Sequence, residues 1–178
     1  MKEIVSIFLI GVSLSMDTFS LSLTIGSLNY KAKLLKILPL MVGIFHFLMP
    51  LFGNYIGIKM VEIFNIAGNV ILGIVLITLG VNLAIHYFKD EKVELNINLL
   101  SVIMFAFSVS IYSFSVGLGL NEITRNNILS SLIFALCSST FTYLGLLIGK
   151  YSNKLIGKYA IILGITLLLF LGIFHLLA

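Results

Sequence analysis

Six long apolar stretches occupy most of this chain, and they limit what it can fold into. Among 178 residues they cover Ile4–Gly26, Ile37–Ile58, Ile66–Phe88, Leu99–Leu120, Ile128–Gly149 and Leu155–Leu177. A helix needs about 20 apolar residues, each rising about 1.5 Å, to cross the hydrocarbon core of a bilayer. Each stretch has this length. The chain is therefore predicted to be an all-α integral membrane protein with six transmembrane helices.

The composition excludes the main alternatives to this class. Apolar residues make up 60% of the chain and charged residues only 10%, which is outside the usage of soluble domains. The strands of a membrane barrel would show short alternating segments, whereas these runs are continuous and contain the small residues that let helices pack in lipid. The first stretch resembles a signal peptide in length, but Asp17 interrupts it, so we expect it to be retained.

The short connections between the stretches predict the orientation of the chain in a cell membrane. Eight lysines fall on one side, in the first, third and fifth connections: Lys31, Lys33, Lys36, Lys89, Lys92, Lys150, Lys154 and Lys158. Only Lys2, Lys59 and Arg125 fall on the other side. Cytoplasmic loops are enriched in Lys and Arg, so both termini are predicted to be extracytoplasmic. The same bias explains the net positive charge, and no nucleic-acid partner is expected.

The second half of the sequence repeats the first. Residues 13–20 align with residues 108–115, with four identities in eight positions and with Thr18 facing Ser113. Gly53 and Gly57 in the second stretch correspond to Gly145 and Gly149 in the fifth, and residues 71–74 repeat as 162–165. Two three-helix repeats, 1–90 and 91–178, are therefore predicted within one membrane domain.

Three crossings per repeat is an odd number, so the second repeat must enter the membrane from the opposite side. Inverted repeats of this kind are typical of alternating-access transporters, which hold their substrate near the midplane between the repeats. We therefore expect a secondary transporter whose site lies between the first and fourth helices. Glycines in the first, second, fourth and fifth helices would allow close packing or bending.

Asp17 is the strongest candidate for a site residue. Of seven acidic residues it alone lies deep within an apolar stretch, where a lone carboxylate costs about 2.5 to 3.5 kcal/mol and needs a partner, a proton or a cation. Three hydroxyl residues lie at helical spacing from Asp17: Ser13 before it, and Ser20 and Thr24 after it. They predict one face of the helix lined with hydroxyl groups. Ser113, which faces Thr18 in the repeat alignment, is the matching candidate in the second repeat.

His46 is the second candidate, in the middle of the second stretch. Its imidazole could be a metal ligand, a proton carrier or a hydrogen-bonded core group. Pro50 follows four residues later, and because proline lacks an amide donor it predicts a bend in the helix or a freed carbonyl.

At these positions the chain resembles the MntP-type manganese efflux pumps, which belong with the LysE-like six-helix exporters. The resemblance rests on Ser15-Met16-Asp17 in the first stretch, on residues 43–53 in the second and on residues 110–120 in the fourth. It implies a six-helix fold, with Mn²⁺ as substrate and no resident cofactor, and it implies Asp17 as a site residue.

The chain departs from the family pattern at two acidic positions, because Tyr112 stands at the second-repeat aspartate and His46 at the second-helix glutamate. Mn²⁺ favours oxygen ligands and accepts imidazole, so Asp17 and His46 are the expected metal ligands, with Tyr112 and the hydroxyls nearby. A single carboxylate cannot neutralise a divalent ion, so we expect weaker binding than in a relative with three acids.

Three functions remain open from the sequence. The first is proton-coupled Mn²⁺ efflux, the second is proton-coupled export of another small solute, and the third is a membrane protein of the same fold that has lost transport. An enzyme is not expected, because no nucleophile with a base, multi-carboxylate centre or phosphate loop appears. The expected partners are the lipid bilayer and the transported cation or solute, and a six-helix bundle is also compatible with a homodimer.

Overall fold

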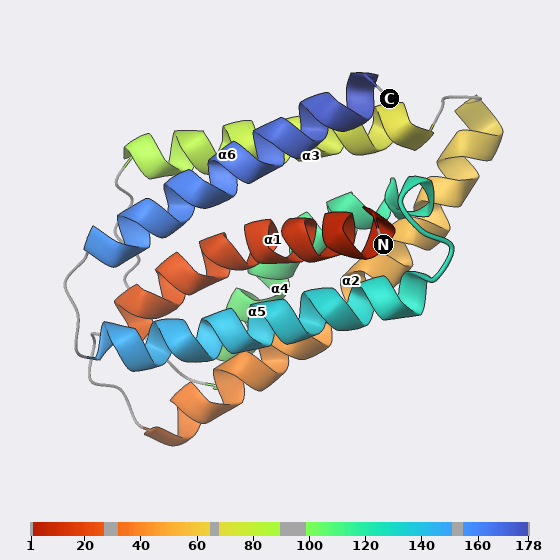
Figure 1. Ribbon diagram of the computed structural model, residues 1–178. Coiled ribbons are helices and arrows are strands. Elements are labelled where there is room, and N and C mark those ends of the chain that lie inside the picture. Colours follow the sequence, from red (N-terminus) through yellow and green to blue (C-terminus); the bar gives the residue numbers. More distant parts are fainter. Residues whose placement is uncertain (1, 27–31, 65–67, 90–98, 151–154, 178) are drawn as a thin grey trace.

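The computed structural model describes residues 2–26, 32–64, 68–89, 99–150 and 155–177, which form six long helices and one short one (Figure 1). The helices are α1 (Lys2–Gly26), α2 (Ala32–Phe64), α3 (Gly68–Lys89), α4 (Leu99–Gly117), the 3-10 helix η1 (Leu120–Glu122), α5 (Asn127–Gly149) and α6 (Leu155–Leu177). These residues contain no strand. The predicted all-α fold is confirmed, and each predicted stretch corresponds to one helix.

Two helix boundaries differ from the prediction. α2 has 33 residues and is about 50 Å long at 1.5 Å per residue, so it extends beyond the apolar stretch at both ends. α4 stops at Gly117, three residues before the predicted end, because the chain tightens there into turns. The amide of Leu118 donates to the carbonyl of Ser115, and the amide of Gly119 donates to that of Val116. η1 follows these turns and leads the chain toward α5.

Each of two helix pairs joins the first half of the chain to the second. α1 packs along α5, and α2 packs along α4. In Figure 1 the two helices of each pair run in the same direction, while the α1–α5 pair runs opposite to the α2–α4 pair. Both chain termini lie at the same end of the bundle (Figure 1). An inverted repeat would produce this pairing, and the inverted repeat itself stays a prediction.

The α1–α5 pair is held at backbone contact by glycines of α5. A Cβ atom on Gly145 would lie 2.7 Å from the carbonyl oxygen of Phe19, and a Cβ atom on Gly149 would overlap the carbonyl of Leu23. Only a residue without a side chain allows this approach, as is common at helix interfaces in membranes.

The α2–α4 pair repeats the same two contacts. A Cβ atom on Gly53 would overlap the carbonyl of Phe114, and one on Gly57 would overlap the carbonyl of Leu118. Phe114 is the residue that faces Phe19 in the repeat alignment. The glycines that correspond in sequence therefore make corresponding contacts.

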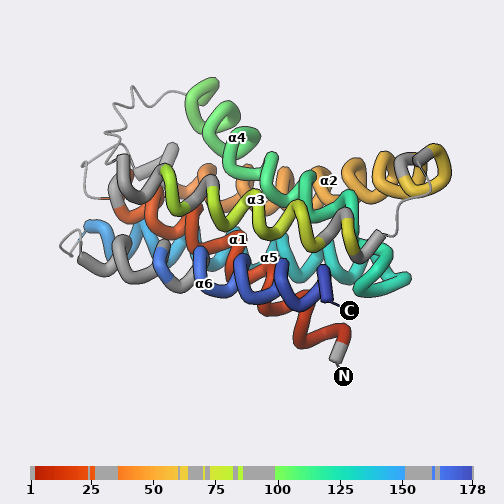
Figure 2. Tube along the Cα trace, turned by 90° about the horizontal axis from the view of Figure 1, so that it is seen from above, coloured from red at the N-terminus to blue at the C-terminus, as the bar shows by residue number. Residues whose placement is uncertain are grey.

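The remaining contacts are uneven. α2 also packs along α5, α3 packs along α6, and α6 packs along α1, whereas α4 touches α1 and α3 only sparsely. Figure 2 shows the N-terminal end of α4 standing away from the other helices. α4 is thus attached to the bundle mainly through α2.

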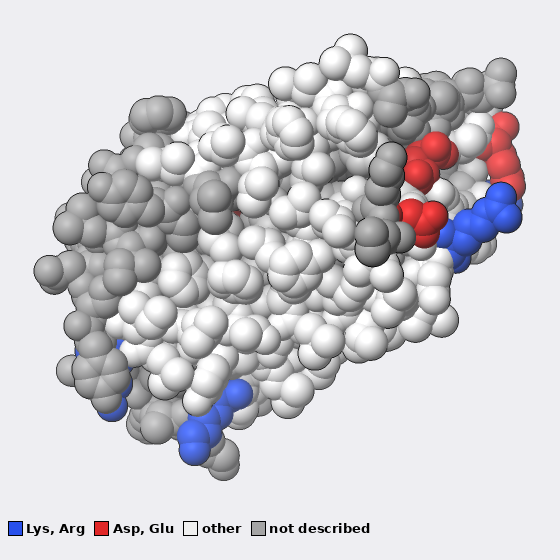
Figure 3. Space-filling model, in the orientation of Figure 1, with Lys and Arg blue, Asp and Glu red and all other residues white. Residues whose placement is uncertain are grey.

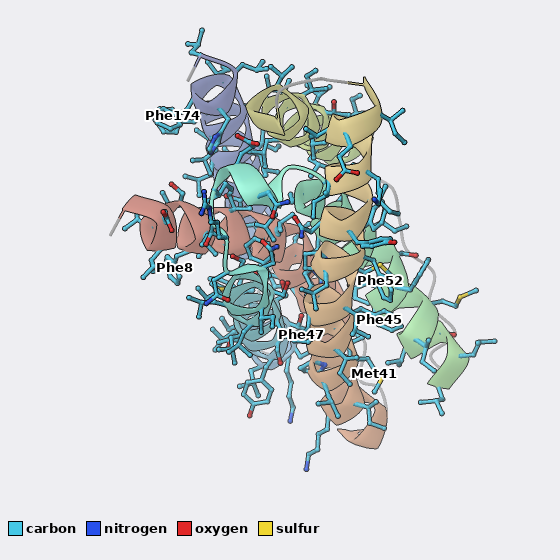
Figure 4. The ribbon with its side chains drawn as sticks, turned by 90° about the vertical axis from the view of Figure 1, so that its right-hand side faces the viewer. Phe8, Met41, Phe45, Phe47, Phe52 and Phe174 are labelled. Carbon is cyan, nitrogen blue, oxygen red and sulfur yellow. The ribbon has the colours of Figure 1, made fainter. Side chains whose placement is uncertain are left out.

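The surface of the bundle agrees with a membrane location. Charged side chains gather at two ends, and the middle of the visible face is nearly free of them (Figure 3). Phe8 and Phe174 point away from the bundle (Figure 4) and are more than half exposed. Within the described residues, four helices contain segments long and apolar enough to cross a membrane: Glu3–Leu23, Lys36–Ile63, Leu99–Gly117 and Asn127–Gly149. A shorter apolar segment, Ile165–Leu177, lies in α6.

Candidate cation site

A small pocket brings together the two residues that occupy the same place in the two repeats. Asp17 of α1 and Tyr112 of α4 both line it, and both side chains are half-buried. They come from helices that otherwise touch only sparsely. The pocket therefore lies beside two helices, α1 and α4, that have few contacts with each other.

The rest of the pocket lining is one hydroxyl and three leucines: Ser13, Leu14, Leu79 and Leu168. The Ser13 hydroxyl donates to the carbonyl of Leu9 at 2.7 Å, so it offers only oxygen lone pairs to a ligand. A carboxylate in a partly apolar pocket attracts a cation more strongly than it would in water, because the local dielectric is lower. The pocket is therefore a candidate site for a small cation, with one carboxyl group as its acidic ligand.

His46 lies elsewhere, in the interface between α2 and α4. Its side chain is fully buried, and its Nδ1 is 3.0 Å from the carbonyl oxygen of Val42 and 2.9 Å from Oγ of Ser110. The Ser110 hydroxyl donates to the carbonyl of Ala106 at 2.6 Å. Nε2 of the same ring is buried without a hydrogen-bond partner among the described residues.

Pro50 lies within α2, which continues as a helix on both sides of it. Because Pro50 has no amide hydrogen, it cannot make the regular helical bond to the carbonyl four residues earlier, which belongs to His46. The backbone oxygen of His46 therefore lacks its regular helical hydrogen bond. Nε2 of the same residue has no hydrogen-bond partner among the described residues either.

Known proteins resemble this chain over almost its whole length. Residues 29–176 match the family described as "Putative manganese efflux pump". A "Putative manganese efflux pump MntP" of Geobacillus kaustophilus (strain HTA426) is 33% identical over 172 residues, which cover 96% of this chain and 94% of the relative. The protein of the same name from Bacillus mycoides (strain KBAB4) is 31% identical over 175 residues, or 98% of this chain and 96% of the relative.

This chain belongs to the MntP family. A family of this description groups transporters and not enzymes, in agreement with the prediction from sequence. No solved structure matches this chain.

Within this MntP-family fold, the residues predicted for one site occupy separate places. Asp17, Tyr112 and Ser13 share the pocket, whereas Ser20 is half-buried on α1 and is not part of the pocket lining. His46 is on α2, which has no extensive contact with α1. Over the part of the chain that is described, no three His, Cys, Asp or Glu side chains form a metal-binding cluster. The side chain of Thr24 lies outside the described residues.

Ser113 and Thr18, the aligned pair, are both fully buried. Neither hydroxyl has a hydrogen-bond partner among the described residues. A buried hydroxyl without a partner costs free energy, so both positions are available to a ligand or to an ordered water. Thr18 and Ser113, which align with each other in this MntP-family chain, follow Asp17 and Tyr112 in sequence but do not line the pocket.

Ser110, Ser15 and Ser138 are the polar residues that the sequence did not single out. Ser15 of α1 lies 3.2 Å from Ser138 of α5, measured between their Oγ atoms. Ser15 aligns with Ser110, and the spacing of the corresponding glycines aligns Ser138 with His46. The same interhelical contact thus exists twice in the MntP-family bundle, once with a serine and once with an imidazole. The repeat alignment contained this signal, but only the helix pairing shows that the residues touch.

Proposed function

We propose that this protein exports Mn²⁺ across the cell membrane as a secondary transporter. The observation that carries the proposal is the match to the manganese efflux family over 148 aligned positions, from residue 29 to residue 176. The named relatives support it, since each aligns with more than nine-tenths of the chain. The pocket at Asp17 supplies a place where a cation could bind within the membrane.

We assign the first contact of the cation to Asp17, with Tyr112 and Ser13 completing the pocket. Hard divalent cations favour carboxylate, hydroxyl and carbonyl oxygens. With one carboxylate the bound ion keeps a residual positive charge, which favours loose binding and ready release. His46, on the other helix pair, is the second ligand in this proposal and receives the ion at a later step.

The glycine contacts support a particular division into moving parts. α1 and α5 touch at their backbones and would move together, as would α2 and α4. These pairs do not coincide with the sequence halves 1–90 and 91–178, because each pair contains one helix from each half. We therefore propose that the α2–α4 pair rocks against the α1–α5 pair, with α3 and α6 on the side of α1.

The seam between α2 and α5 would serve as the pivot of this motion. These two helices pack closely: a Cβ atom on Gly43 would lie 3.2 Å from Cβ of Ser139. On the opposite side, α4 has few contacts with α1 and α3, and the pocket lies there. A rotation about the α2–α5 seam would therefore open and close the pocket while breaking few contacts. Alternating access needs a motion of this kind around a fixed site.

Export of a cation against the membrane potential requires an energy source. A potential that is negative inside opposes export by about 2.3 kcal/mol per unit charge per 100 mV, and Mn²⁺ carries two charges. We propose exchange against protons, in which inward proton movement offsets this opposition. The basic end of the bundle, with exposed Lys36 and Lys150 among the described residues, would face the cytoplasm. Both termini would then lie outside.

The test is Mn²⁺ flux in liposomes that contain the purified protein, measured as quenching of a trapped fluorescent indicator. The wild type is expected to carry Mn²⁺ at a rate that rises when a proton gradient is applied. Asp17→Asn keeps the shape of the side chain but removes its charge, and is expected to lose flux by at least tenfold. Glu3→Gln is the matched control, because Glu3 is an exposed acid on the same helix.

The outcomes separate the alternatives. Flux that needs Asp17 but not Glu3 supports Mn²⁺ export through the pocket. If Asp17→Asn carries Mn²⁺ as fast as the wild type, the assignment of the site is contradicted, while Mn²⁺ remains the proposed substrate. No Mn²⁺ flux in the wild type would contradict the proposed function, and pH-driven uptake of organic solutes would then be measured with the same liposomes.

A further inference from the structure

The hydrogen bonds around His46 determine which of its ring nitrogens carries the proton. The carbonyl oxygen of Val42 can only accept a hydrogen bond, and it lies 3.0 Å from Nδ1. A bare Nδ1 would place two lone pairs against each other at this distance. The neutral ring therefore carries its hydrogen on Nδ1 and has its lone pair on Nε2.

Ser110 completes this arrangement from the other helix. Its hydroxyl hydrogen is directed to the carbonyl of Ala106 at 2.6 Å, which is also an acceptor only. Oγ of Ser110 then accepts from Nδ1 of His46 at 2.9 Å. Val42 is on the same helix as His46, so Ser110 is the group that fixes the ring relative to α4.

The consequence is a lone pair in a buried interface, without a partner among the described residues. Nε2 is fully buried and no described residue bonds to it. A buried acceptor of this kind costs about 1 to 3 kcal/mol unless a ligand satisfies it. Histidines that bind metals typically donate their other ring N–H to a carbonyl or similar group, which fixes the tautomer and the ring orientation. His46 has this arrangement before any metal is present.

The equivalent contact in the other pair shows what the fold alone requires. Ser15 donates to the carbonyl of Gly11 at 2.6 Å, as Ser110 does to that of Ala106, and its Oγ lies 3.2 Å from Oγ of Ser138. A serine at the position of His46 therefore satisfies the packing of such a pair. The imidazole adds a ring nitrogen that the equivalent contact does not have.

We propose that Ser110 is a positioning residue for the exported cation: it fixes the orientation of the His46 ring relative to α4, in the tautomer that the Val42 carbonyl sets, so that Nε2 is the nitrogen ligand on the α2–α4 pair. This inference rests on the proposed function, because it takes Mn²⁺ as the ligand. Ser110 itself does not touch the ion. Its effect passes through the ring of His46.

The experiment measures Mn²⁺ binding to the detergent-purified protein by titration, together with pulsed electron paramagnetic resonance of the bound ion. In the wild type the spectrum is expected to show coupling to an imidazole nitrogen, and His46→Ala is expected to remove it. Ser110→Ala is expected to raise Kd by about tenfold, the lower end of the range for residues that orient metal ligands. Ser110→Thr keeps the hydroxyl and is expected to restore Kd to near the wild-type value.

Ser15→Ala is the matched control, since it removes the equivalent hydroxyl from a pair with no imidazole, and it is expected to leave Kd and the nitrogen coupling unchanged. The double variant His46→Ala with Ser110→Ala is expected to bind no more weakly than His46→Ala alone. If Ser110→Ala weakens binding equally with and without His46, Ser110 is merely structural and the proposal is wrong.

A second readout keeps the proposal separable from the proposed function. If Mn²⁺ is carried by the wild type but its spectrum shows no nitrogen coupling, the role of Ser110 and His46 is overturned while Mn²⁺ export stands. If Mn²⁺ neither binds nor crosses, the proposed function fails first. If Ser110→Ala does not fold, Ser110→Thr and the wild-type spectrum still test the proposal, and an absent nitrogen signal contradicts it.

Discussion

Asp17 and Tyr112 occupy the same position in the two repeats and line the same pocket. A pocket at this place in an inverted repeat would have two equivalent carboxylates if both copies had kept an acid. Here one of the two is a phenol, so the pocket has one formal negative charge at neutral pH, because a tyrosine ordinarily ionises near pH 10. The affinity for a divalent cation should follow from this charge count.

Tyr112→Asp should bind Mn²⁺ more tightly than the wild type. A second carboxylate in the pocket adds Coulomb attraction, and part of this gain is lost to the repulsion between the two acids in the empty protein. We expect Kd to fall by roughly tenfold, which corresponds to a gain of about 1.4 kcal/mol in binding free energy. Titration of the purified protein measures it, with Tyr112→Phe as the control for losing the ring hydroxyl alone. An unchanged Kd in Tyr112→Asp would mean that the ion does not enter this pocket.

Gly149→Ala should destabilise the folded protein by about 1 to 3 kcal/mol, the usual cost of overpacking a tight interface. The new methyl group would overlap the carbonyl of Leu23, which is backbone and cannot turn aside. Thermal unfolding in detergent measures the loss. Gly57→Ala should cost a similar amount, because it meets Leu118 in the corresponding contact.

The control for these glycines is Gly11→Ala in the same α1–α5 interface. Its methyl group would lie 3.2 Å from a ring carbon of Phe134 and 3.5 Å from the sulfur of Cys137, and both side chains can shift. We expect a much smaller loss of stability. Equal losses at Gly11 and Gly149 would show that backbone contact is not what distinguishes these positions.

A disulfide between α1 and α5 should leave transport intact if the two helices move as one unit. Ser15→Cys with Ser138→Cys is suitable, because the two Oγ atoms are only 3.2 Å apart. The background variant is Cys137→Ser, which removes the one native cysteine. We expect the oxidised protein to keep more than half of the Mn²⁺ flux of its reduced form. Loss of flux on oxidation and recovery on reduction would show that α1 and α5 move against each other.

The orientation of the chain can be tested with a thiol reagent that does not cross membranes. In the Cys137→Ser background, Arg125→Cys places a thiol at an exposed position in the α4–α5 connection, and Lys150→Cys places one at the opposite end of the bundle. We expect intact cells to label the first and not the second, which should react only after permeabilisation. The reverse pattern would invert the proposed topology.

The six helices could be predicted from the sequence because apolar length alone determines them in a bilayer. The end of α4 could not, since the helix ends at Gly117, where its backbone packs against that of Pro50 on α2, and a contact between distant segments is not visible in the sequence. The repeat was visible in Gly53, Gly57 and their counterparts. The repeat did not reveal that Gly53 and Gly57 bring α2 against α4, and not against α1 or α3, which are the neighbours of α2 in the chain.

The candidate site was predicted in part. Asp17 and Tyr112 were paired by alignment, and they line one pocket. His46 was predicted to share a metal with Asp17, and that stays a proposal, because the two side chains sit on helices without extensive contact. Helical spacing shows which residues share a face of one helix, but it does not show which helix covers that face. Ser110 was overlooked for this reason.

The pairing of α1 with α5 and of α2 with α4 also has a consequence for insertion into the membrane during translation. α1 is translated well before the glycines that seat it, Gly145 and Gly149 of α5. Asp17 likewise enters the membrane before its pocket neighbours on α3, α4 and α6, which are Leu79, Tyr112 and Leu168. The close contacts of the described glycines in the first half all reach residues of the second half. A single repeat expressed alone would need a second copy, inserted upside down, to make the same contacts.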